Sequence, residues 1–186
     1  MPQELFSPVI ETERLTLKPL TIDDSASLLA IFSDSEVMRY WNTAPWSTDE
    51  DALDFIHQSS ASMQRQEGLT LGVYVKASGK LVGKCMLFSY DQESKRAELG
   101  FGLGRSAWGK GYIQEAGEAL IQYGFETLGL RRIEAEIDPD NYASAKALEK
   151  LGFTREGLLR QRWEINGIVS DSALYGRLVS DPARPH

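Results

Sequence analysis

The most constraining feature of this sequence is a glycine-rich stretch, AELGFGLGRSAWGKGY, over residues 97–112. Its first half alternates as a strand does, with apolar residues on the face expected to meet the core and one acid with three glycines on the other. The apolar set is Leu99, Phe101 and Leu103, and the opposite set is Glu98, Gly100, Gly102 and Gly104. Repeated glycine on one face indicates either a bend or small-residue packing seam, or a ligand lying against the backbone. The glycines alone leave both interpretations open.

The second half of the stretch, Trp108-Gly109-Lys110-Gly111, stands directly before a long helical pattern that begins at Tyr112. Unpaired amides at a helix N-terminus, with the helix dipole behind them, bind phosphate groups. Glycines let the backbone curl so that several N–H groups point at one anion, and a lysine adds positive charge. This arrangement favours a phosphate-binding loop over a merely flexible turn.

Two nucleotide-binding motifs partly match the same stretch. Residues 104–111 read GRSAWGKG, a Walker A pattern in which Gly111 replaces the Ser or Thr that would hold magnesium. Gly102, Gly104 and Ala107 satisfy GxGxxA, but further glycines would then fall in the first turns of the helix. We therefore expect a diphosphate held without a metal. A metal-free nucleotide-binding enzyme is kept as a less favoured alternative.

The rest of the chain alternates strand and helix patterns. Strands are expected over residues 14–20, 69–76, 80–89, 96–103, 131–137, 153–160 and 169–178. Helices are expected to begin at Thr21 and to span residues 47–66, 112–128 and 142–151. The helix over 47–66 has an apolar stripe of Leu53, Phe55, Ile56 and Met63. This order predicts an α+β (mixed α/β) fold with a central, mostly antiparallel, twisted sheet of six to seven strands and helices on both faces. We expect one domain, residues 1–186, with loosely held ends near 1–10 and 180–186.

Composition narrows the class of protein. A chain of 186 residues with 42% hydrophobic residues can build a core without disulfides. Its lone cysteine, Cys85, lies in an apolar strand pattern and is expected in the core rather than as a nucleophile. With two histidines, a zinc site would need an improbable ligand set. The net charge of −7 opposes nucleic-acid binding, and no signal peptide or membrane span is evident, so a cytoplasmic protein is expected.

A diphosphate with an organic arm along an open strand describes coenzyme A. The sequence resembles the GCN5-related N-acetyltransferase (GNAT) family, and within it the Rim-type ribosomal-protein N-terminal acetyltransferases. The resemblance covers nearly the whole chain through TERLTLKPL, VMRYW, AELGFGLGRSAWGKGYIQEA, RRIEAEIDPDNYASAKALEKLGF and DSALYGRL. Its most specific parts are WGKGY followed by Glu115, and NxxSxxxLEKLGF over residues 141–153. The implied fold is the GNAT fold, and the implied co-substrate is acetyl-CoA.

The resemblance also implies residue roles. The coenzyme-binding set would be Phe101, Gly102, Leu103, Trp108, Gly109, Lys110, Gly111, Tyr112, Asn141 and Ser144. Loop amides would hold the pyrophosphate, and the strand backbone near Phe101 would pair with the pantetheine arm along an edge that Gly100 and Gly102 leave exposed. Asn141 has a second interpretation as a plain helix N-cap, and the two are compatible.

This chain departs from the family pattern at two places. The usual Gln or Arg three residues before the first loop glycine is Ser106 here, with Arg105 one position early. The Tyr that protonates the leaving thiolate in many members is replaced by Leu148, so Ser144 or water is left as the general acid. A catalytically weak coenzyme A-binding sensor or partner protein is therefore an alternative to an enzyme.

Acetyl transfer to an amine needs no covalent nucleophile, because the thioester is already activated, so direct attack in a ternary complex is expected. Glu98 is the candidate general base, since it shares the glycine face about 6.6 Å from Gly100. The alternative is a surface Glu paired with Lys95 or Arg96. Backbone N–H groups near residues 101–103 are candidates for polarising the acetyl carbonyl.

The acceptor is the least determined part of the sequence. Residues 38–46, MRYWNTAPW, concentrate aromatic side chains in a Pro-containing loop, and Tyr40, Trp41 and Trp46 either wall the acceptor entrance or fill the core. His57 is expected to be an exposed helix residue. The negative net charge and the Rim-type resemblance favour an amine on a protein or peptide N-terminus, or a small cationic molecule. A homodimer is a further possibility that the resemblance suggests.

Overall fold

The computed structural model describes residues 3–182 and contains one eight-stranded sheet in the order β1-β2-β3-β4-β5-β6-β8-β7. The strands are β1 (Ile10–Glu11), β2 (Leu15–Pro19), β3 (Leu69–Val75), β4 (Lys80–Asp91), β5 (Arg96–Leu103), β6 (Arg132–Ile137), β7 (Thr154–Ile165) and β8 (Ile168–Leu178). All neighbouring strands are antiparallel except β5 and β6. The mixed fold class is confirmed. The count exceeds the expected six to seven because the two-residue β1 is too short to show an alternation.

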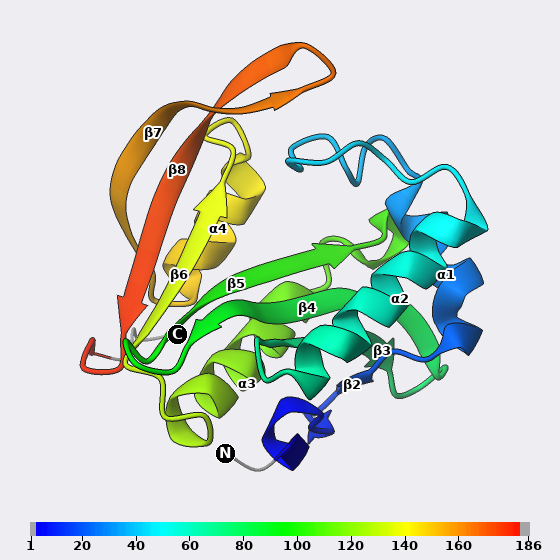
Figure 1. The fold of residues 1–186 in the computed structure, drawn as a ribbon, viewed down its shortest axis with the longest axis horizontal. Coiled ribbons are helices and arrows are strands. Elements are labelled where there is room, and N and C mark those ends of the chain that lie inside the picture. The colour runs from blue at the N-terminus through cyan, green and yellow to red at the C-terminus, as the bar shows by residue number, and fades with distance from the viewer. Residues whose placement is uncertain (1–2, 183–186) are drawn as a thin grey trace.

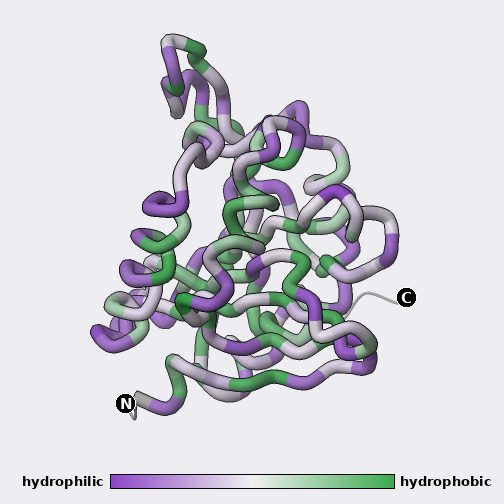
Figure 2. Tube along the Cα trace, turned by 90° about the vertical axis from the view of Figure 1, so that its right-hand side faces the viewer, coloured by the Kyte–Doolittle hydropathy of each residue, from purple (hydrophilic) through white to green (hydrophobic). Residues whose placement is uncertain are grey.

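Helices cover both faces of this sheet (Figure 1). The α-helices are α1 (Ser25–Phe32), α2 (Asp49–Gln64), α3 (Tyr112–Glu126) and α4 (Tyr142–Lys150), and short 3-10 helices span η1 (Gln3–Phe6), η2 (Ile22–Asp24) and η3 (Arg105–Ala107). The α1–α2 pair packs on one face through Phe32 and Ile56, and α3 packs on the other through Leu120. Along the chain, apolar stretches alternate with hydrophilic ones, as expected for elements with one face on a core (Figure 2).

Local signals explain where the helices start. Thr21 with Asp24 forms a capping box before η2, and Thr48 with Asp51 forms another before α2. The buried face of α2 differs from the expected apolar stripe. It consists of Ala52, Ile56, Ser59 and Met63. Two of these residues are small and one of them is polar, so a hydrophobicity pattern does not reveal this face.

The feature that positions the site is the divergence of β5 from β6. These strands pair only from Arg96 to Glu98, and beyond that point they separate (Figure 1). On the other side of β5, the amide of Gly104 donates to the carbonyl of Val82 in β4. Backbone groups alternate in direction along an antiparallel strand, so those of Phe101 and Leu103 point away from β4. They therefore line an open edge inside the molecule.

Leu5 and Phe6, within the N-terminal stretch that the sequence predicts to be loosely held, contact the rest of the domain, and residues 1–2 lie outside the described part of the chain. Phe6 is fully buried and its ring lies against Tyr90, with centroids 5.3 Å apart. The Tyr123 hydroxyl donates to the carbonyl of Leu5 over 2.6 Å. Residues 183–186 of the expected loose C-terminus lie outside the described part of the chain. Within residues 3–182, no helix combines the length and the apolar character needed to cross a membrane.

Candidate active site

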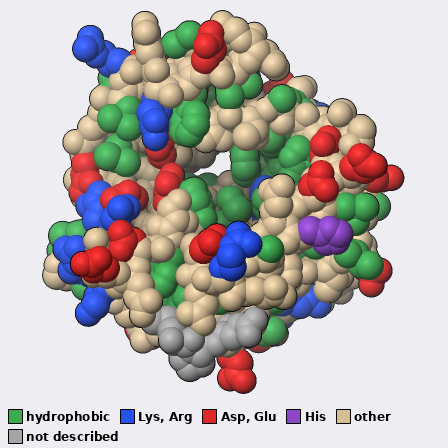
Figure 3. Space-filling view, in the orientation of Figure 1, with side chains coloured by type: hydrophobic (Ala, Val, Ile, Leu, Met, Phe, Trp, Pro, Cys, Tyr) green, Lys and Arg blue, Asp and Glu red, His purple; other side chains and the backbone are tan. Residues whose placement is uncertain are grey.

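Two cavities with shared lining residues lie where β5 and β6 diverge, and Figure 3 shows that this face of the molecule is hollowed near its centre. The loop cavity, about 450 Å³, is lined by the β5 edge and by Trp108, Gly109, Gly111 and Tyr112. The acid cavity, about 620 Å³, is lined by four carboxylates, Glu98, Glu136, Asp138 and Asp171. Both are bounded by Tyr40, Trp41, Phe101, Asn141 and Ser144. A molecule lying along the β5 edge would therefore contact both cavities.

The loop after β5 has the backbone shape expected of an anion site. Gly109 and Gly111 have φ of +73° and +80°, in the left-handed region that other residues rarely adopt. Gly111 is also the N-cap of α3 and provides no side chain to cap the helix. The first amides of α3 therefore lack a capping side chain and form the positive end of the helix dipole, which suits a phosphate.

Arg14 holds this loop in place, a role that sequence reasoning missed. Its Nη1 donates to the carbonyl of Lys110 over 2.8 Å, and its Nε donates to Glu115 over 2.7 Å. Thr12 donates its hydroxyl to the same carboxylate over 2.6 Å. Burial opposes ionisation, yet hydrogen bonds from Thr12 and Arg14 keep the pKa of Glu115 below its usual value. The acid that follows WGKGY thus fastens the loop to the strand region before β2.

The loop is also tied to the edge of β5. The indole Nε1 of Trp108 donates to the carbonyl of Leu103 over 2.9 Å. The pairing with β6 stops at Glu98, so the remaining edge groups of Phe101 and the amide of Leu103 face the loop cavity. A strand-like arm could add to this edge as another strand would.

The glycines of β5 have a different role from the expected one. A Cβ at Gly102 would lie 2.7 Å from Trp41 and 2.9 Å from Phe32, and one at Gly100 would lie 3.0 Å from Met86. Side chains therefore cover the strand at Gly102, so the prediction that this glycine exposes the edge is wrong. Gly100, in contrast, lines the acid cavity together with Glu98. The divergence of β6 opens the edge, and Gly102 makes room for the α1–α2 loop (residues 33–48) to pack on the strand.

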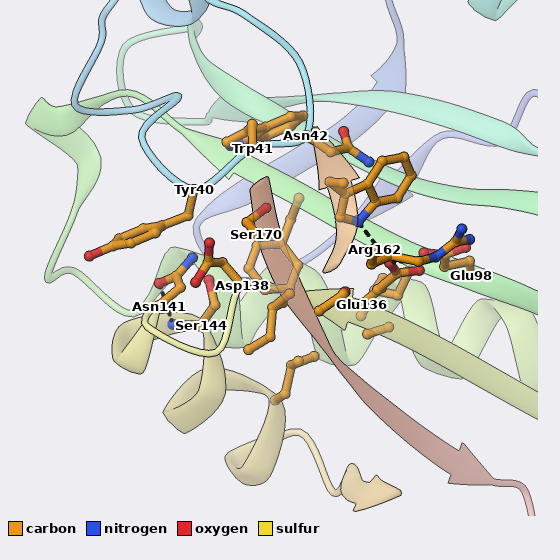
Figure 4. Close-up of a pocket in the computed structure, with 18 of the residues that line it drawn as sticks. Tyr40, Trp41, Asn42, Glu98, Glu136, Asp138, Asn141, Ser144, Arg162 and Ser170 are labelled. Carbon is orange, nitrogen blue, oxygen red and sulfur yellow. Dashed lines mark hydrogen bonds and ion pairs between the residues drawn. The ribbon is translucent and has the colours of Figure 1, made fainter. Parts of the chain in front are cut away.

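Glu98 lies at one end of the acid cavity, beside Glu136 and Arg162 (Figure 4). Burial, together with the negative charges of Glu136 and Glu134, raises the pKa of Glu98 to about 7, although Arg162 opposes the shift. The alternative of a surface ion pair is not observed, because no ion pair of Glu98 occurs among the described residues. The neighbouring Arg96 pairs instead with Asp91 and Glu134. A carboxyl group with this pKa can accept a proton near neutral pH.

Several residues of the acid cavity were missed in the sequence. Glu136 accepts a hydrogen bond from the indole of Trp163 over 2.9 Å, and Arg162 lies 3.5 Å from the same carboxylate. Arg162 and Trp163 belong to β7, whose pairing with β8 is irregular between Leu159 and Trp163. Gln161 there has φ of +53°. Such a bulge redirects side chains, and no pattern in the sequence marks it.

The residues at the start of α4 lie at the opposite end of the acid cavity (Figure 4). The Asn141 side chain accepts a hydrogen bond from the Ser144 amide over 3.2 Å, so the N-cap interpretation is confirmed. Both residues also line the two cavities. Leu148 is fully buried and contributes to the wall of the acid cavity. No titratable side chain therefore stands at the position of the family's Tyr.

The aromatic residues of the α1–α2 loop divide into two groups. Tyr40 and Trp41 line both cavities, as expected of an acceptor wall. Trp46 lines neither cavity and packs between Phe32 and Phe55, with ring centroids 5.3 Å from each. Its assignment to acceptor binding is therefore wrong. Its backbone amide donates to the carbonyl of Phe32, and its ring is partly buried against the core.

Two other sequence interpretations concern groups outside the cavities. Cys85 is buried, and burial raises the pKa of its thiol to about 12, which leaves it unreactive near neutral pH. Arg105 points to the α1–α2 loop, where its Nε lies 2.6 Å from Asp34, rather than to the glycine loop. No cluster of three or more potential metal-binding His, Cys, Asp or Glu side chains occurs in residues 3–182.

Comparisons with known proteins agree on one family. Residues 14–154 match the family model described as an acetyltransferase (GNAT) domain. The uncharacterized N-acetyltransferase p20 of Bacillus licheniformis is 38% identical over 172 residues, covering 92% of this chain and 97% of p20. The spermidine N(1)-acetyltransferase of Escherichia coli is 26% identical over 151 residues, covering 81% of this chain and 78% of that protein.

A solved structure shares the fold. Mycobacterium smegmatis RimJ, determined in complex with CoA-disulfide, superposes with a TM-score of 0.88 at 19% identity, and the match covers 97% of this chain and 91% of RimJ. This likeness confirms the fold that the sequence predicts.

Proposed function

This chain belongs to the GNAT acetyltransferase family, and we propose that it acts as a single domain that moves the acetyl group of acetyl-CoA onto a primary amine by direct attack. One observation carries the proposal. The open edge of β5, at Phe101 and Leu103, joins a cavity with a helix-terminal glycine loop to a cavity with a carboxyl group of raised pKa.

The residues of the loop cavity suit coenzyme A. Amides of residues 109–112 would bind the pyrophosphate, since they lie at the uncapped N-terminus of α3, whereas the Trp108 amide already donates to the carbonyl of Arg105. The backbone of Phe101 and Leu103 would pair with the pantetheine arm, and Asn141 with Ser144 would face that arm from α4. Acetyl-CoA supplies an acetyl group already activated as a thioester.

In the acid cavity, Glu98 would accept the proton that the acceptor amine loses, directly or through a water molecule. Its pKa near 7 lets it take that proton at neutral pH. The free amides of the β5 edge would stabilise negative charge on the carbonyl oxygen during attack. Ser144 lines both cavities at the far end from Glu98, and its hydroxyl or a water molecule would donate a proton to the departing thiolate.

The acceptor should be a cationic or N-terminal amine. Four carboxylates and one guanidinium, that of Arg162, line the acid cavity, so its field attracts positive charge. The aromatic rings of Tyr40 and Trp41 beside them would contact an ammonium group favourably. A polyamine acceptor, as named for the spermidine N(1)-acetyltransferase relative, and a protein N-terminus both carry such a group.

Mass spectrometry of a panel of amines incubated with the protein and acetyl-CoA tests this function. The panel contains polyamines, other small primary amines and peptides with free N-termini, and the matched control replaces each with its N-blocked form. We expect acetylation of at least one unblocked amine and none of the blocked forms. Tight acetyl-CoA binding without transfer to any member would instead favour the sensor or partner protein, which the leucine at position 148 permits.

A further inference from the structure

Lys84 is the only charged side chain among the described residues that is almost completely buried, with 3% of it exposed. It lies in the middle of the sheet on β4. Its register partners are Gly72 on β3 and Gly102 on β5. Glycine on both sides leaves room on this face of the sheet for the lysine chain and for rings that pack over it.

Four aromatic rings surround the ammonium group. The distances from Nζ to the ring centroids are 3.6 Å for Phe55, 4.4 Å for Phe32, 4.9 Å for Trp41 and 5.1 Å for Trp46. Phe32 comes from α1, Phe55 from α2, and the two tryptophans from the loop between them. All four distances fall in the range of cation–π attraction. We call this group the aromatic cage.

No carboxylate compensates the charge of Lys84. None of the ion pairs within residues 3–182 includes it, and burial alone lowers its pKa to about 7. A buried charge of this kind costs stability relative to an apolar side chain of the same size. What the ammonium adds is a preferred position for each ring face around it. The cage therefore favours one arrangement of the rings rather than a more stable fold.

One ring of the cage also belongs to the site. Trp41 lines both cavities, and its Cζ2 atom would lie 2.7 Å from a Cβ at Gly102. Gly102 stands between Phe101 and Leu103, whose backbone groups form the open edge of β5. A rotation of the Trp41 ring would change the shape of the wall that the two cavities share.

We propose that Lys84 is a positioning residue for acetyl transfer, because its ammonium group fixes the orientation of Trp41 and through it the wall shared by the two cavities. The effect on catalysis rests on the proposed function. The orientation of Trp41, in contrast, can be measured without any substrate.

The test compares Lys84→Met, which keeps the length and removes the charge, with Lys84→Arg, which keeps the charge. Lys80→Met is the matched control, since Lys80 begins the same strand and is exposed. The indole N–H signal of Trp41, assigned by its loss in Trp41→Phe, is followed in ¹⁵N-labelled protein below pH 7, where Lys84 carries its charge. We expect one sharp signal in the wild type, Lys84→Arg and Lys80→Met, and a broadened or doubled signal in Lys84→Met.

The Lys84→Met substitution should lower activity without lowering stability. In Lys84→Met, the melting temperature should not fall, because a buried charge is removed, while kcat/KM for the acceptor should fall about tenfold. Lys84→Arg should recover most of that loss. A merely structural lysine would lose stability and activity together and would gain nothing from arginine.

A single sharp Trp41 signal in Lys84→Met, or a kcat/KM within twofold of the wild type, would overturn the proposal. If Lys84→Arg does not fold, Lys84→Met and Lys80→Met alone decide it. Failure of the wild-type protein to acetylate any amine would reject the proposed function only, since the Trp41 signal needs no substrate.

Discussion

Trp41 packs directly on the backbone of Gly102, so closely that a Cβ at this glycine would lie 2.7 Å from the indole Cζ2 atom. This contact joins the α1–α2 loop to the strand whose free edge runs between the two cavities. It also assigns the β5 glycine a packing role, one of the two interpretations that the sequence had left open. The shape of the site thus depends on a missing side chain beneath an aromatic ring.

Replacing Gly102 with alanine should therefore disturb both stability and the site. We expect Gly102→Ala to lose about 1–3 kcal/mol, the usual cost of overpacking, and to weaken acetyl-CoA binding. Gly157→Ala is the control, because a Cβ at Gly157 meets nothing within 4 Å. Urea unfolding and calorimetric titration measure the two effects. Equal stability of the two variants would contradict the close contact.

The glycine loop makes a second prediction. Gly109 and Gly129 have nearly the same backbone conformation, with φ of +73° and +70°, and open space where a Cβ would stand. Alanine at either position should cost about 1–2 kcal/mol through backbone strain. Only Gly109→Ala should also weaken acetyl-CoA binding, because Gly129 follows α3 at its far end. Matching losses of affinity in both variants would show that the loop has no special part in binding.

Arg14 supplies a third prediction. Arg14→Met removes the hydrogen bond to the Lys110 carbonyl and the pair with Glu115, so the loop should lose its fixed position. Acetyl-CoA affinity should fall about two- to tenfold, as for the loss of a typical hydrogen bond. Arg65→Met removes a comparably short pair with Glu67 at the end of α2 and should leave the affinity unchanged. An unaltered dissociation constant in Arg14→Met would show that the loop holds its shape alone.

Glu98→Gln keeps the size of the side chain and removes its capacity to accept a proton. We expect kcat to fall about 10²- to 10⁴-fold, the range for loss of a general base, with little change in acetyl-CoA affinity. Steady-state kinetics with the best acceptor of the panel measures the first quantity and calorimetry the second. A variant that retains the wild-type kcat over a wide pH range would remove Glu98 from the mechanism.

The raised pKa of Glu98 adds a pH dependence with a definite sign. The wild-type kcat should rise with pH through about 7, as the carboxyl group loses its proton, and this rise should be absent in Glu98→Gln.

The stability of the wild-type protein should instead fall as pH rises through this range. A group whose pKa is higher in the folded than in the unfolded state contributes stability below the unfolded value, and that contribution is lost as pH rises through the folded value. As pH rises from about 4.5 to 7, the free energy of unfolding of Glu98→Gln, measured with urea, should therefore increase relative to that of the wild type. A difference between the two free energies that does not change with pH would contradict the assigned pKa.

The features that the sequence predicts correctly are those determined by residues adjacent in the chain. The alternation in β5, the helix start at Thr21 and the glycine loop before α3 each depend on neighbouring residues, and all appear in the structure. The partner strands that create the open edge are far apart in the chain. Their divergence after Glu98 depends on packing of the whole sheet, which no local pattern records.

The same reason accounts for the residues that were misjudged or missed. Trp46 looked equivalent to Trp41, but only the fold shows that one ring faces the cavities and the other faces Phe55. Arg162 reaches Glu136 only because of an irregularity in β7. Lys84 is charged, and nothing in its neighbours in the chain indicates that three separate segments would enclose it.

A crystal structure of the protein with acetyl-CoA tests the central claim most directly. We expect the pyrophosphate on the amides of residues 109–112, the pantetheine arm along Phe101 and Leu103, and the acetyl group at the opening to the acid cavity. A coenzyme bound at another place, or a β5 edge occupied by the protein's own chain, would contradict the account.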